Sequence, residues 1–385
     1  MKARWIVSLF AICLLLIVAA YIFISSQPPA RIFYLDRSIL AASSSAAAIP
    51  APLPVAHIKT PVAVKAVYMT ACLASESRLR EAVLTTISGT EINSLMIDLK
   101  DYTGTIAYAS TTLLAPHGTG CRIYDLPAFV AELHSKGVYV IGRITVFQDP
   151  VYATAHPADA VQSRSRPGHP WLDRNGLAYV DPDAREYWDR VVAIAKEGYS
   201  IGFDEINFDY IRFPSDGDMS DALFALPPVR SASTTPKTAV MDEFFSYLHS
   251  KLAPSGIVMS ADIFGQTTVN TDDLGIGQIL EKVLPYFDYV APMVYPSHFI
   301  NGFEGYANPA AYPYEVVKIS MTSAVERAAM ATTSLEKLRP WLQAFNLGAT
   351  YTPAMVHAEQ KAVYDSGLTS WMLWDAANRY NKEEL

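Results

Sequence analysis

The sequence predicts a (β/α)8 or TIM barrel, a closed ring of eight parallel strands in which each strand is followed by a helix. Eight short runs of mostly apolar, β-prone residues alternate with segments that carry apolar residues at helical spacing. Several of the helical segments end at a glycine, as helix C-termini commonly do. The alternative is an open, doubly wound sheet, but no glycine-rich phosphate loop follows the first predicted strand.

The predicted barrel domain covers residues 62–385, and its elements follow one another in regular order. We expect strands at residues 62–70, 94–101, 138–147, 201–213, 257–265, 286–295, 340–345 and 370–376. The expected helices include the intervening segments SRLREAVLTTISG, DLPAFVAELHSKG, AREYWDRVVAIAKEG, MDEFFSYLHSKLAPSG and TPAMVHAEQKAVYDSG. Long insertions follow the third, fourth and sixth strands, at the carboxyl ends where barrel enzymes build their sites.

The N-terminus carries an uncharged, mostly apolar run at residues 5–24, preceded by Lys2 and Arg4. A helix of this length spans about 30 Å, which is the thickness of the hydrocarbon core of a bilayer. We expect a transmembrane anchor within residues 1–25; a cleaved signal peptide and a buried core helix are the alternatives. The preceding positive charges predict a cytoplasmic N-terminus and an extracytoplasmic domain, which would be secreted if the segment is cleaved.

Residues 26–61 are expected to link this segment to the barrel. From residue 41 onward they are dominated by Ala, Ser and Pro and show no hydrophobic periodicity. The chain has three cysteines, and Cys13 falls in the apolar run, which leaves Cys72 and Cys121 in the barrel domain. These two can form a disulfide in an oxidising compartment, and two unlinked, partly buried thiols are the alternative.

The composition argues against nucleic acid as a partner. The formal net charge is −8, charged residues make up 18% of the chain, and no cluster of Lys and Arg forms a basic stripe. With 22 Tyr, 16 Phe and 6 Trp, the chain has enough rings for a large core and for a binding cleft. A membrane, reached through the N-terminal segment, is the partner that the sequence predicts at this point.

The stretch GFDEINFDYIRFPSDG, residues 202–217, places several charges in a strand that is expected to be buried. Residues two apart on a strand share a face, so Glu205, Asn207 and Asp209 point together. Ile206 and Phe208 point the opposite way, toward the expected helix layer. We therefore expect the polar set to face the barrel interior, with Asp209 nearest the mouth at the carboxyl end.

Buried carboxylates need a partner, because an unpaired buried charge is costly. Arg143, on the neighbouring third strand, is the expected partner. A Glu205–Arg143 ion pair with a purely structural role is the competing interpretation. Arg212 is out of phase with the polar set and can reach the cleft only beyond the end of the strand. Asp204 is also out of phase and would face inward only through a β-bulge.

Polar residues recur at the ends of other predicted strands. They are Asp98, Asp101, Asp262, Tyr295 and Asp375. Because the carboxyl ends of barrel strands meet at one face, we expect these side chains to converge on one cleft. Two carboxyl groups across a cleft are the apparatus of glycoside hydrolysis, in which one protonates the leaving oxygen and the other attacks the anomeric carbon or activates water.

Aromatic rings at the same face can stack on the apolar faces of sugars. The candidates are Phe147, Tyr210, Phe264, Tyr295, Phe299, Trp371 and Trp374, and core packing competes with this role for each of them. Trp371 and Trp374 differ in parity, so at most one of them faces the interior. His298 is expected in a surface loop rather than in the cleft. The sequence carries no motif for a metal site or for a catalytic serine or cysteine, so we expect no metal and no cofactor.

The chain resembles a family of bacterial glycosyl hydrolase domains in three blocks, GFDEINFDYIRFPSDG, PMVYPSHF and SWMLWDAANRY. The resemblance extends over residues 62–380 and implies a TIM barrel related to glycoside hydrolases. A more distant likeness is to family 18 chitinases, whose fourth strand carries DxxDxDxE. Asp204 and Asp209 match that pattern, whereas Asn207 replaces an acid and Ile211 stands where the catalytic Glu would be. The absence of this Glu argues against the family 18 chitinase mechanism.

An α-amylase-like arrangement fits the acids better. This resemblance implies Asp209 as nucleophile or base and Asp262 as proton donor, although α-amylase-like enzymes use a Glu at the second place. The predicted catalytic residues are Asp209, Asp262, Glu205 and Asp204. The predicted substrate-binding residues are Asp98, Arg143, Asn207, Arg212, Tyr295, Trp374 and Asp375.

The predicted function is hydrolysis of a cell-envelope or extracellular polysaccharide or oligosaccharide. A catalytically silent barrel that binds glycan or organises an envelope complex is the alternative. A polysaccharide lyase or transglycosylase is a third possibility.

Overall fold

The computed structural model describes residues 55–110, 119–224 and 236–385. These residues belong to one compact unit that begins at Val55. The expected membrane segment and most of the expected linker lie outside the described ranges, so both stay predictions. Within those ranges, none of the helices combines the length and the apolar character that a membrane span requires.

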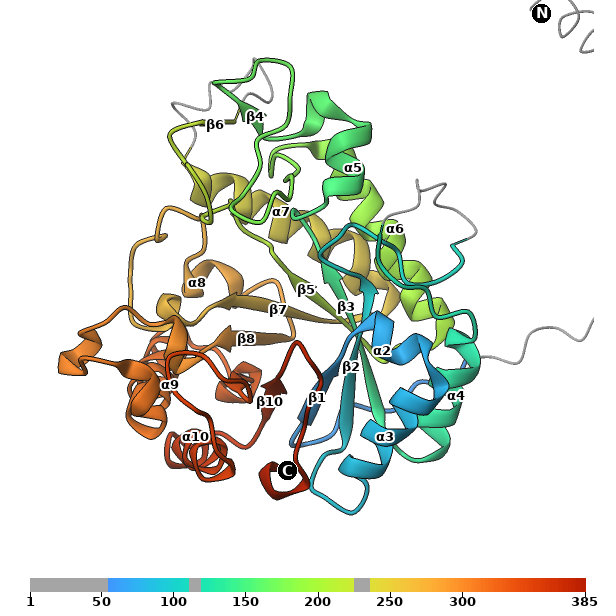
Figure 1. The fold of residues 1–385 in the computed structure, drawn as a ribbon, viewed down its shortest axis with the longest axis vertical. Coiled ribbons are helices and arrows are strands. Elements are labelled where there is room, and N and C mark those ends of the chain that lie inside the picture. The colour runs from blue at the N-terminus through green and yellow to red at the C-terminus, as the bar shows by residue number, and fades with distance from the viewer. Residues whose placement is uncertain (1–54, 111–118, 225–235) are drawn as a thin grey trace, which may run out of the picture. The chain divides into compact units, whose positions relative to one another are not determined.

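Eight parallel strands close into a barrel, which confirms the predicted fold (Figure 1). In chain order they are β1 (Lys65–Met69), β2 (Ser94–Lys100), β3 (Tyr139–Thr145), β5 (Glu205–Asp209), β7 (Val258–Phe264), β8 (Tyr289–Met293), β9 (Trp341–Gln343) and β10 (Trp371–Trp374). Each strand pairs with the next one along the chain, and β10 pairs with β1 to close the ring. Each of the eight barrel strands lies within one of the eight stretches that the sequence predicts.

The alternation of residues along β5 sorts its side chains between two buried layers. Ile206 and Phe208 belong to the large core between the strands and the helices, where the Phe208 ring lies 6.1 Å from that of Phe287. Glu205 and Asn207 are fully buried on the other face, where Glu205 bonds Tyr139 of β3 and Asn207 bonds Ser260 of β7. A separate apolar cluster shares the barrel interior; its members include Tyr68, Met96, Tyr139, Ile141, Trp341 and Met372. The predicted parity is therefore confirmed.

Helices surround the barrel (Figure 1). They are α2 (Ala71–Ser75), α3 (Ser77–Ile87), α4 (Leu126–Ser135), α6 (Arg185–Ile201), α7 (Lys237–Leu252), α8 (Leu280–Val283), α9 (Pro313–Met330) and α10 (Pro353–Asp365). The spacing in α6 explains its orientation, since Val191, Ile194 and Gly198 recur at three- and four-residue steps on the buried face. The helix ends at Gly202, whose φ of 124° disfavours any residue with a Cβ, and a Cβ there would lie 3.0 Å from Val130 Cγ1.

The insertions after β3 and β5 fold together into a lobe, made of α5 (Pro150–Ala155), β4 (Gln162–Ser163) and β6 (Ala222–Leu223), which projects from the barrel (Figure 1). Strands β4 and β6 pair antiparallel, and the lobe has a small core of its own, formed by Val161, Trp171, Tyr179 and Ala222. The sequence predicts both insertions but not their pairing, because the pairing joins two short segments that lie far apart in the chain.

Residues 55–61 pack against the amino-terminal end of the barrel. The Ile58 N–H donates to Asp204 Oδ1 at 2.6 Å, and the His57 ring stacks on Tyr199 with centroids 3.9 Å apart. The last part of the expected linker thus contacts the barrel at the end opposite to the carboxyl ends of its strands.

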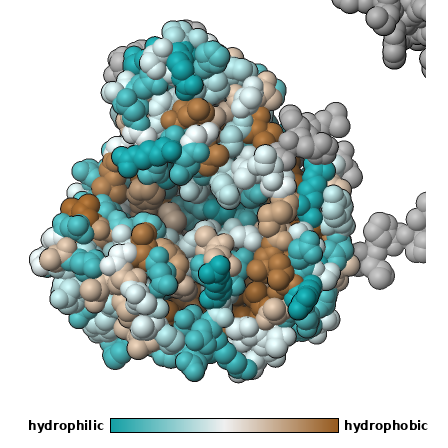
Figure 2. All heavy atoms as spheres, in the orientation of Figure 1, coloured by the Kyte–Doolittle hydropathy of each residue, from teal (hydrophilic) through white to brown (hydrophobic). Residues whose placement is uncertain are grey.

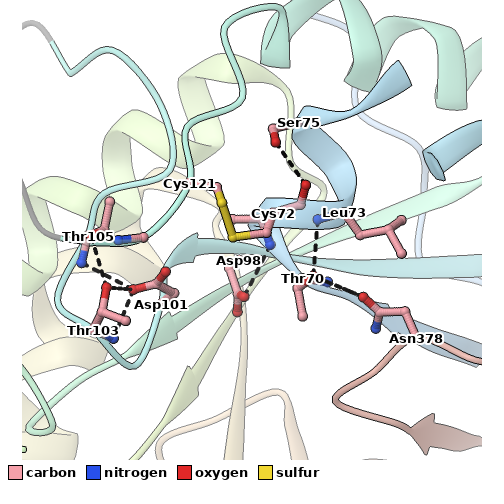
Figure 3. Close-up of a disulfide and its surroundings, with 12 residues drawn as sticks. Thr70, Cys72, Leu73, Ser75, Asp98, Asp101, Thr103, Thr105, Cys121 and Asn378 are labelled. Atoms are coloured by element: carbon pink, nitrogen blue, oxygen red, sulfur yellow. Dashed lines mark hydrogen bonds between the residues drawn. A yellow bond between two sulfur atoms is a disulfide. The ribbon is translucent and has the colours of Figure 1, made fainter. Parts of the chain in front are cut away.

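A disulfide joins Cys72, in α2, to Cys121, in the loop before α4 (Figure 3). The two Cα atoms are 4.7 Å apart, within the roughly 7 Å that a bridge can span. Of the two alternatives that the sequence leaves open, the structure therefore contains the bridge. It ties the loop after β1 to the loop after β2, beside Asp98 and Asp101 (Figure 3).

We expect replacement of both bridged cysteines by serine to lower the free energy of unfolding by about 2–4 kcal/mol, because the bridge constrains the unfolded chain. The bridged residues are 49 positions apart. Thermal unfolding of the double variant and the wild type, with and without reductant, measures the change. Thiol titration of the denatured full chain is the control: of its three cysteines, one should react before reduction and all three after it. Three reactive thiols before reduction, in protein refolded under oxidising conditions, would contradict the bridge.

Candidate active site

A cavity of about 520 Å³ opens at the carboxyl ends of the barrel strands. Figure 2 shows this face of the molecule hollowed below the projecting lobe. Six of the predicted site residues line the cavity: Arg143, Asp209, Arg212, Asp262, Tyr295 and Trp374. Other lining residues include Tyr210, Asp216, Phe264, Gln266, His298 and Phe299.

Asp209 is the last residue of β5, and its carboxylate is held from two sides. Arg143 donates to Oδ2 through Nε at 3.1 Å and through Nη2 at 2.5 Å, and the Tyr210 N–H donates to Oδ1 at 2.6 Å. Tyr210 has a φ of 53°, a strained conformation for a residue other than glycine, and it turns the chain out of the barrel directly after Asp209. Arg143, on the neighbouring strand β3, thus places a positive charge against the Asp209 carboxyl group at the end of β5.

Arg143 binds two carboxylates. Its Nη1 donates to Asp98 Oδ1 at 2.7 Å, opposite the bonds to Asp209. Burial opposes the charge of Arg143, but Asp209 and Asp98 together raise the pKa of Arg143 well above its usual value. The guanidinium carbon also lies 5.5 Å from the ring centroid of Tyr68 and 5.0 Å from that of Trp374. Arg143 is therefore a permanent cation in the cavity wall.

Asp262, on β7, accepts its hydrogen bonds from neutral donors. Asn207 Nδ2 at 2.8 Å and Trp341 Nε1 at 2.9 Å both donate to Oδ1. Burial first, and then the negative charge of Asp209, raise the pKa of Asp262 well above its usual value. Because both donors point at Oδ1, we place the proton of the neutral acid on Oδ2. The cavity therefore holds two carboxyl groups in different surroundings: Asp209 bonds a cation, whereas Asp262 bonds neutral donors and has a raised pKa.

Aromatic rings form part of the cavity wall. Trp374, at the end of β10, stacks on Tyr68 with centroids 4.0 Å apart. Trp371 points to the helix layer instead, where its Nε1 donates to the Tyr364 hydroxyl at 2.9 Å. The prediction that at most one of the two tryptophans faces the interior is confirmed. Phe147 packs against Phe244 in the core, with centroids 4.9 Å apart, and does not line the cavity.

Two further polar side chains reach the cavity from strand ends. Arg212 lies beyond the end of β5, as predicted, and its guanidinium carbon is 4.4 Å from the centroid of Phe264. Burial raises the pKa of Tyr295 well above its usual value, and the negative charge of Asp209 adds to this effect. The Tyr295 hydroxyl therefore keeps its proton and can donate to a ligand.

Glu205 lies deeper in the barrel than the cavity. It accepts hydrogen bonds from Arg339 Nη1 at 2.9 and 3.0 Å and from the Tyr139 hydroxyl at 3.0 Å. The Glu205–Arg143 ion pair of the competing interpretation does not form, because Arg143 lies level with Asn207 in the β3–β5 register. Its position assigns Glu205 a structural role and corrects the expectation of a catalytic one.

Asp204 lies at the amino-terminal end of the barrel, opposite the cavity. It accepts from the N–H groups of Ile58 and Val140, at 2.6 and 2.8 Å, and lies 3.0 Å from His134 Nε2. No bulge turns it inward, so its expected catalytic role is corrected to one of anchoring the residues before β1.

Not all acids at strand ends converge on the cavity. Asp375 accepts from the N–H groups of Ala377 and Arg379, at 2.9 and 2.7 Å, and shapes the turn after β10. Asp101 accepts from the Thr103 N–H at 2.9 Å in the loop after β2 (Figure 3). Asp98 and Asn207 do not line the cavity either, but each of them holds a residue that does.

Sequence reasoning missed several cavity residues. His298 was expected in a surface loop, but it lines the cavity, and burial lowers its pKa despite the charge of Asp216. Gln266 lies in a short 3-10 helix after β7 and Asp216 in a loop after β5, where strand parity says nothing. Trp341 does not line the cavity, but it donates to Asp262 from β9, a strand whose inward-facing residues the sequence does not identify. Across the described ranges, no group of three or more His, Cys, Asp or Glu side chains is arranged to hold a metal ion.

Residues 66–380 match a family described as "Putative glycosyl hydrolase domain". This chain belongs to that family. The match runs from β1 to the segment after β10 and confirms the resemblance carried by the three sequence blocks. A comparison with curated proteins finds no match.

Solved structures similar to this glycosyl hydrolase domain include glycoside hydrolases. The PgaB (BpsB) glycoside hydrolase domain from Bordetella bronchiseptica is 16% identical, with a TM-score of 0.59 over 83% of this chain and 95% of that one. Alpha-L-fucosidase isoenzyme 2 from Paenibacillus thiaminolyticus is 13% identical, with a TM-score of 0.56 over 84% of this chain and 48% of that one. A hypothetical protein from Ruminiclostridium thermocellum ATCC 27405 is 30% identical over 51% of this chain and 96% of that one, with a TM-score of 0.45. The two glycoside hydrolases share the fold with this chain.

We expect Asp262→Asn to stabilise the protein, and to do so more at neutral pH than at acidic pH. The unfolded chain ionises this carboxyl near its usual pKa of 3.8, whereas the folded protein keeps the proton to higher pH. Wild-type stability therefore falls as the pH rises above about 4, and an amide, which does not titrate, removes that loss. The Asn oxygen can still accept from Asn207 and Trp341.

Thermal unfolding of the variant and the wild type between about pH 4 and pH 7 measures this effect. Glu304→Gln, on an exposed turn, is the matched control. A difference in midpoint that stays constant or shrinks as the pH rises would show that Asp262 does not keep its proton.

Proposed function

We propose that this domain hydrolyses glycosidic bonds, with Asp262 as general acid and Asp209 as nucleophile or general base. The observation that carries the proposal is that one cavity holds two carboxyl groups in opposite environments. Arg143 supplies a positive charge beside Asp209, whereas burial and the negative charge of Asp209 raise the pKa of Asp262 and so favour its protonated form. A pair of titratable groups with such different surroundings is how glycosidases assign the acid and the base.

The reaction uses these two groups in turn. Asp262 donates its proton from Oδ2 to the oxygen of the leaving sugar as the glycosidic bond breaks. Asp209 either bonds to the anomeric carbon, to be displaced later by water, or takes a proton from the attacking water. The Tyr295 hydroxyl is available to bond a sugar hydroxyl, and the exposed part of the Trp374 ring offers a flat apolar surface for a sugar face.

The substrate proposed is a polysaccharide or oligosaccharide of the cell envelope or the extracellular medium. The Cys72–Cys121 disulfide supports this location, because such bridges persist mainly in oxidising compartments. The apolar N-terminal run supports a membrane-anchored protein with its catalytic domain outside the cytoplasm, or a secreted one if the run is cleaved.

We expect Asp209→Asn and Asp262→Asn each to lower kcat at least about 10³-fold on a natural glycan, because each removes one of the two groups that act in the transition state. The two variants should differ on aryl glycosides. A good leaving group needs little protonation, so Asp262→Asn should regain much of its rate there while Asp209→Asn should not. Activity of the purified full chain on a panel of glycans and aryl glycosides measures both effects.

Asp375→Asn is the matched control, since Asp375 ends a barrel strand at the same face but lies outside the cavity. Wild-type activity in Asp209→Asn would remove Asp209 from the mechanism. Glycan binding without turnover in the wild type would instead indicate a silent, glycan-binding barrel. Products with a new double bond or a transferred glycosyl group would indicate a lyase or a transglycosylase.

A further inference from the structure

We propose that Asp98 is the second counter-ion of Arg143, which keeps this buried guanidinium paired when the reaction removes the negative charge of Asp209. The inference rests on the proposed function and extends it to a positioning residue that does not itself line the cavity. It reassigns Asp98, which the sequence places among the substrate-binding residues.

The three charged groups form one chain across neighbouring strands. Arg143, on β3, donates through Nη1 to Asp98 on β2 at 2.7 Å and through Nη2 to Asp209 on β5 at 2.5 Å. The exposed fractions are 2% for Asp98, 3% for Arg143 and 4% for Asp209. Water therefore does little to compensate any charge that loses its partner here.

Asp98 is fixed independently of Asp209. The Tyr68 hydroxyl donates to Asp98 Oδ2 at 2.6 Å, and the Ala71 N–H lies 3.4 Å from the same oxygen. Tyr68 is itself held, because it stacks on Trp374 and its backbone carbonyl accepts from the Tyr380 hydroxyl at 2.8 Å. The carboxylate that faces Arg143 on this side thus stays in place whatever happens at Asp209.

Both forms of glycoside hydrolysis neutralise Asp209. If Asp209 Oδ1 or Oδ2 bonds to the anomeric carbon, an ester replaces the carboxylate; if it takes the proton of water, a carboxylic acid does. In each case Asp262 gives its proton to the leaving oxygen, so the proton count balances. The carboxylate formed on Asp262 in the same step bonds Asn207 and Trp341. Without Asp98, the reaction would therefore leave Arg143 with no carboxylate bonded to it, which is costly for a buried cation. With Asp98, the Asp98–Arg143–Asp209 set passes from a net charge of −1 to zero.

Other titratable groups surround this set on every side. They are Tyr68 of β1, Asp101 after β2, Tyr210, Arg212 and Asp216 after β5, Asp262 of β7, Tyr295 after β8 and Tyr380 near the C-terminus. Burial raises the pKa of each of the four tyrosines, so they remain neutral near neutral pH. Arg143 remains the cation that bonds both Asp98 and Asp209.

A stability cycle tests the shared counter-ion without any substrate. Asp98→Asn and Asp209→Asn should each be tolerated, because one carboxylate still pairs with Arg143. The double variant leaves Arg143 without a bonded carboxylate. Its melting temperature should therefore fall by at least about 5 °C more than the sum of the decreases in the two single variants. Adding Arg143→Met to the double variant should restore most of this additional loss in melting temperature, since it removes the unpaired positive charge. Additive shifts, or no recovery with Arg143→Met, would overturn the inference.

Kinetics test the role during the reaction. Asp98→Asn should lower kcat about 10- to 100-fold with a smaller change in KM, because the penalty arises only as Asp209 loses its charge. The acidic limb of the pH–rate profile should move to lower pH, since Asp209 then faces Arg143 alone. Tyr68→Phe keeps the charge of Asp98 and should shift the acidic limb of the profile less. Asp101→Asn is the control, since Asp101 is a nearby acid that does not bind Arg143.

The two proposals fail in different ways. A wild-type kcat and pH profile in Asp98→Asn, together with an inactive Asp209→Asn, would overturn the counter-ion role and leave the proposed hydrolase standing. Full activity in Asp209→Asn would overturn the hydrolase mechanism, and with it the catalytic use of Asp98.

Discussion

A buried guanidinium shared between two carboxylates organises the catalytic end of this barrel. Arg143 lies on the strand between those of Asp98 and Asp209, and it bonds both of them. Burying three charges is tolerable only when each has a partner with good geometry. That requirement sets the rotamer of Arg143, the direction of the Asp209 carboxylate and the placement of Tyr68 and Trp374 around the guanidinium. The position of Asp209 in the cavity depends on this arrangement more than on any apolar contact.

The same physical constraint explains why the two acids of the cavity differ. Asp262 has no such cation bonded to it; Asn207 and Trp341 bond its Oδ1, and the charge of Asp209 disfavours a second carboxylate nearby. The two residues are chemically identical in the sequence. Their different surroundings follow from which neighbours the β-strand register brings to each of them.

Polar pairing also continues below the cavity. Glu205 bonds Arg339 and Tyr139 inside the barrel, and Asp204 ties residues 55–61 to its amino-terminal end. The acidic residues in and just before β5 therefore lie at three levels: Asp204 at the base as an anchor, Glu205 in a buried ion pair in the middle, and Asp209 at the mouth beside the cavity. The disulfide and the lobe both lie at the last of these levels, in segments that follow the carboxyl ends of strands.

The sequence by itself determined the eight strands, the inward set on β5, the exit of Arg212 beyond the strand end and the rule that at most one of Trp371 and Trp374 faces the interior. These follow from local periodicity, because the side-chain alternation of a strand is a property of the strand alone. Tertiary structure decided the partners: that Arg143 pairs with Asp98 and Asp209 rather than with Glu205, that Asp204 lies at the opposite end and that His298 reaches the cavity. Partners depend on register between strands and on the paths of long loops, and both are set by packing among residues distant in the chain.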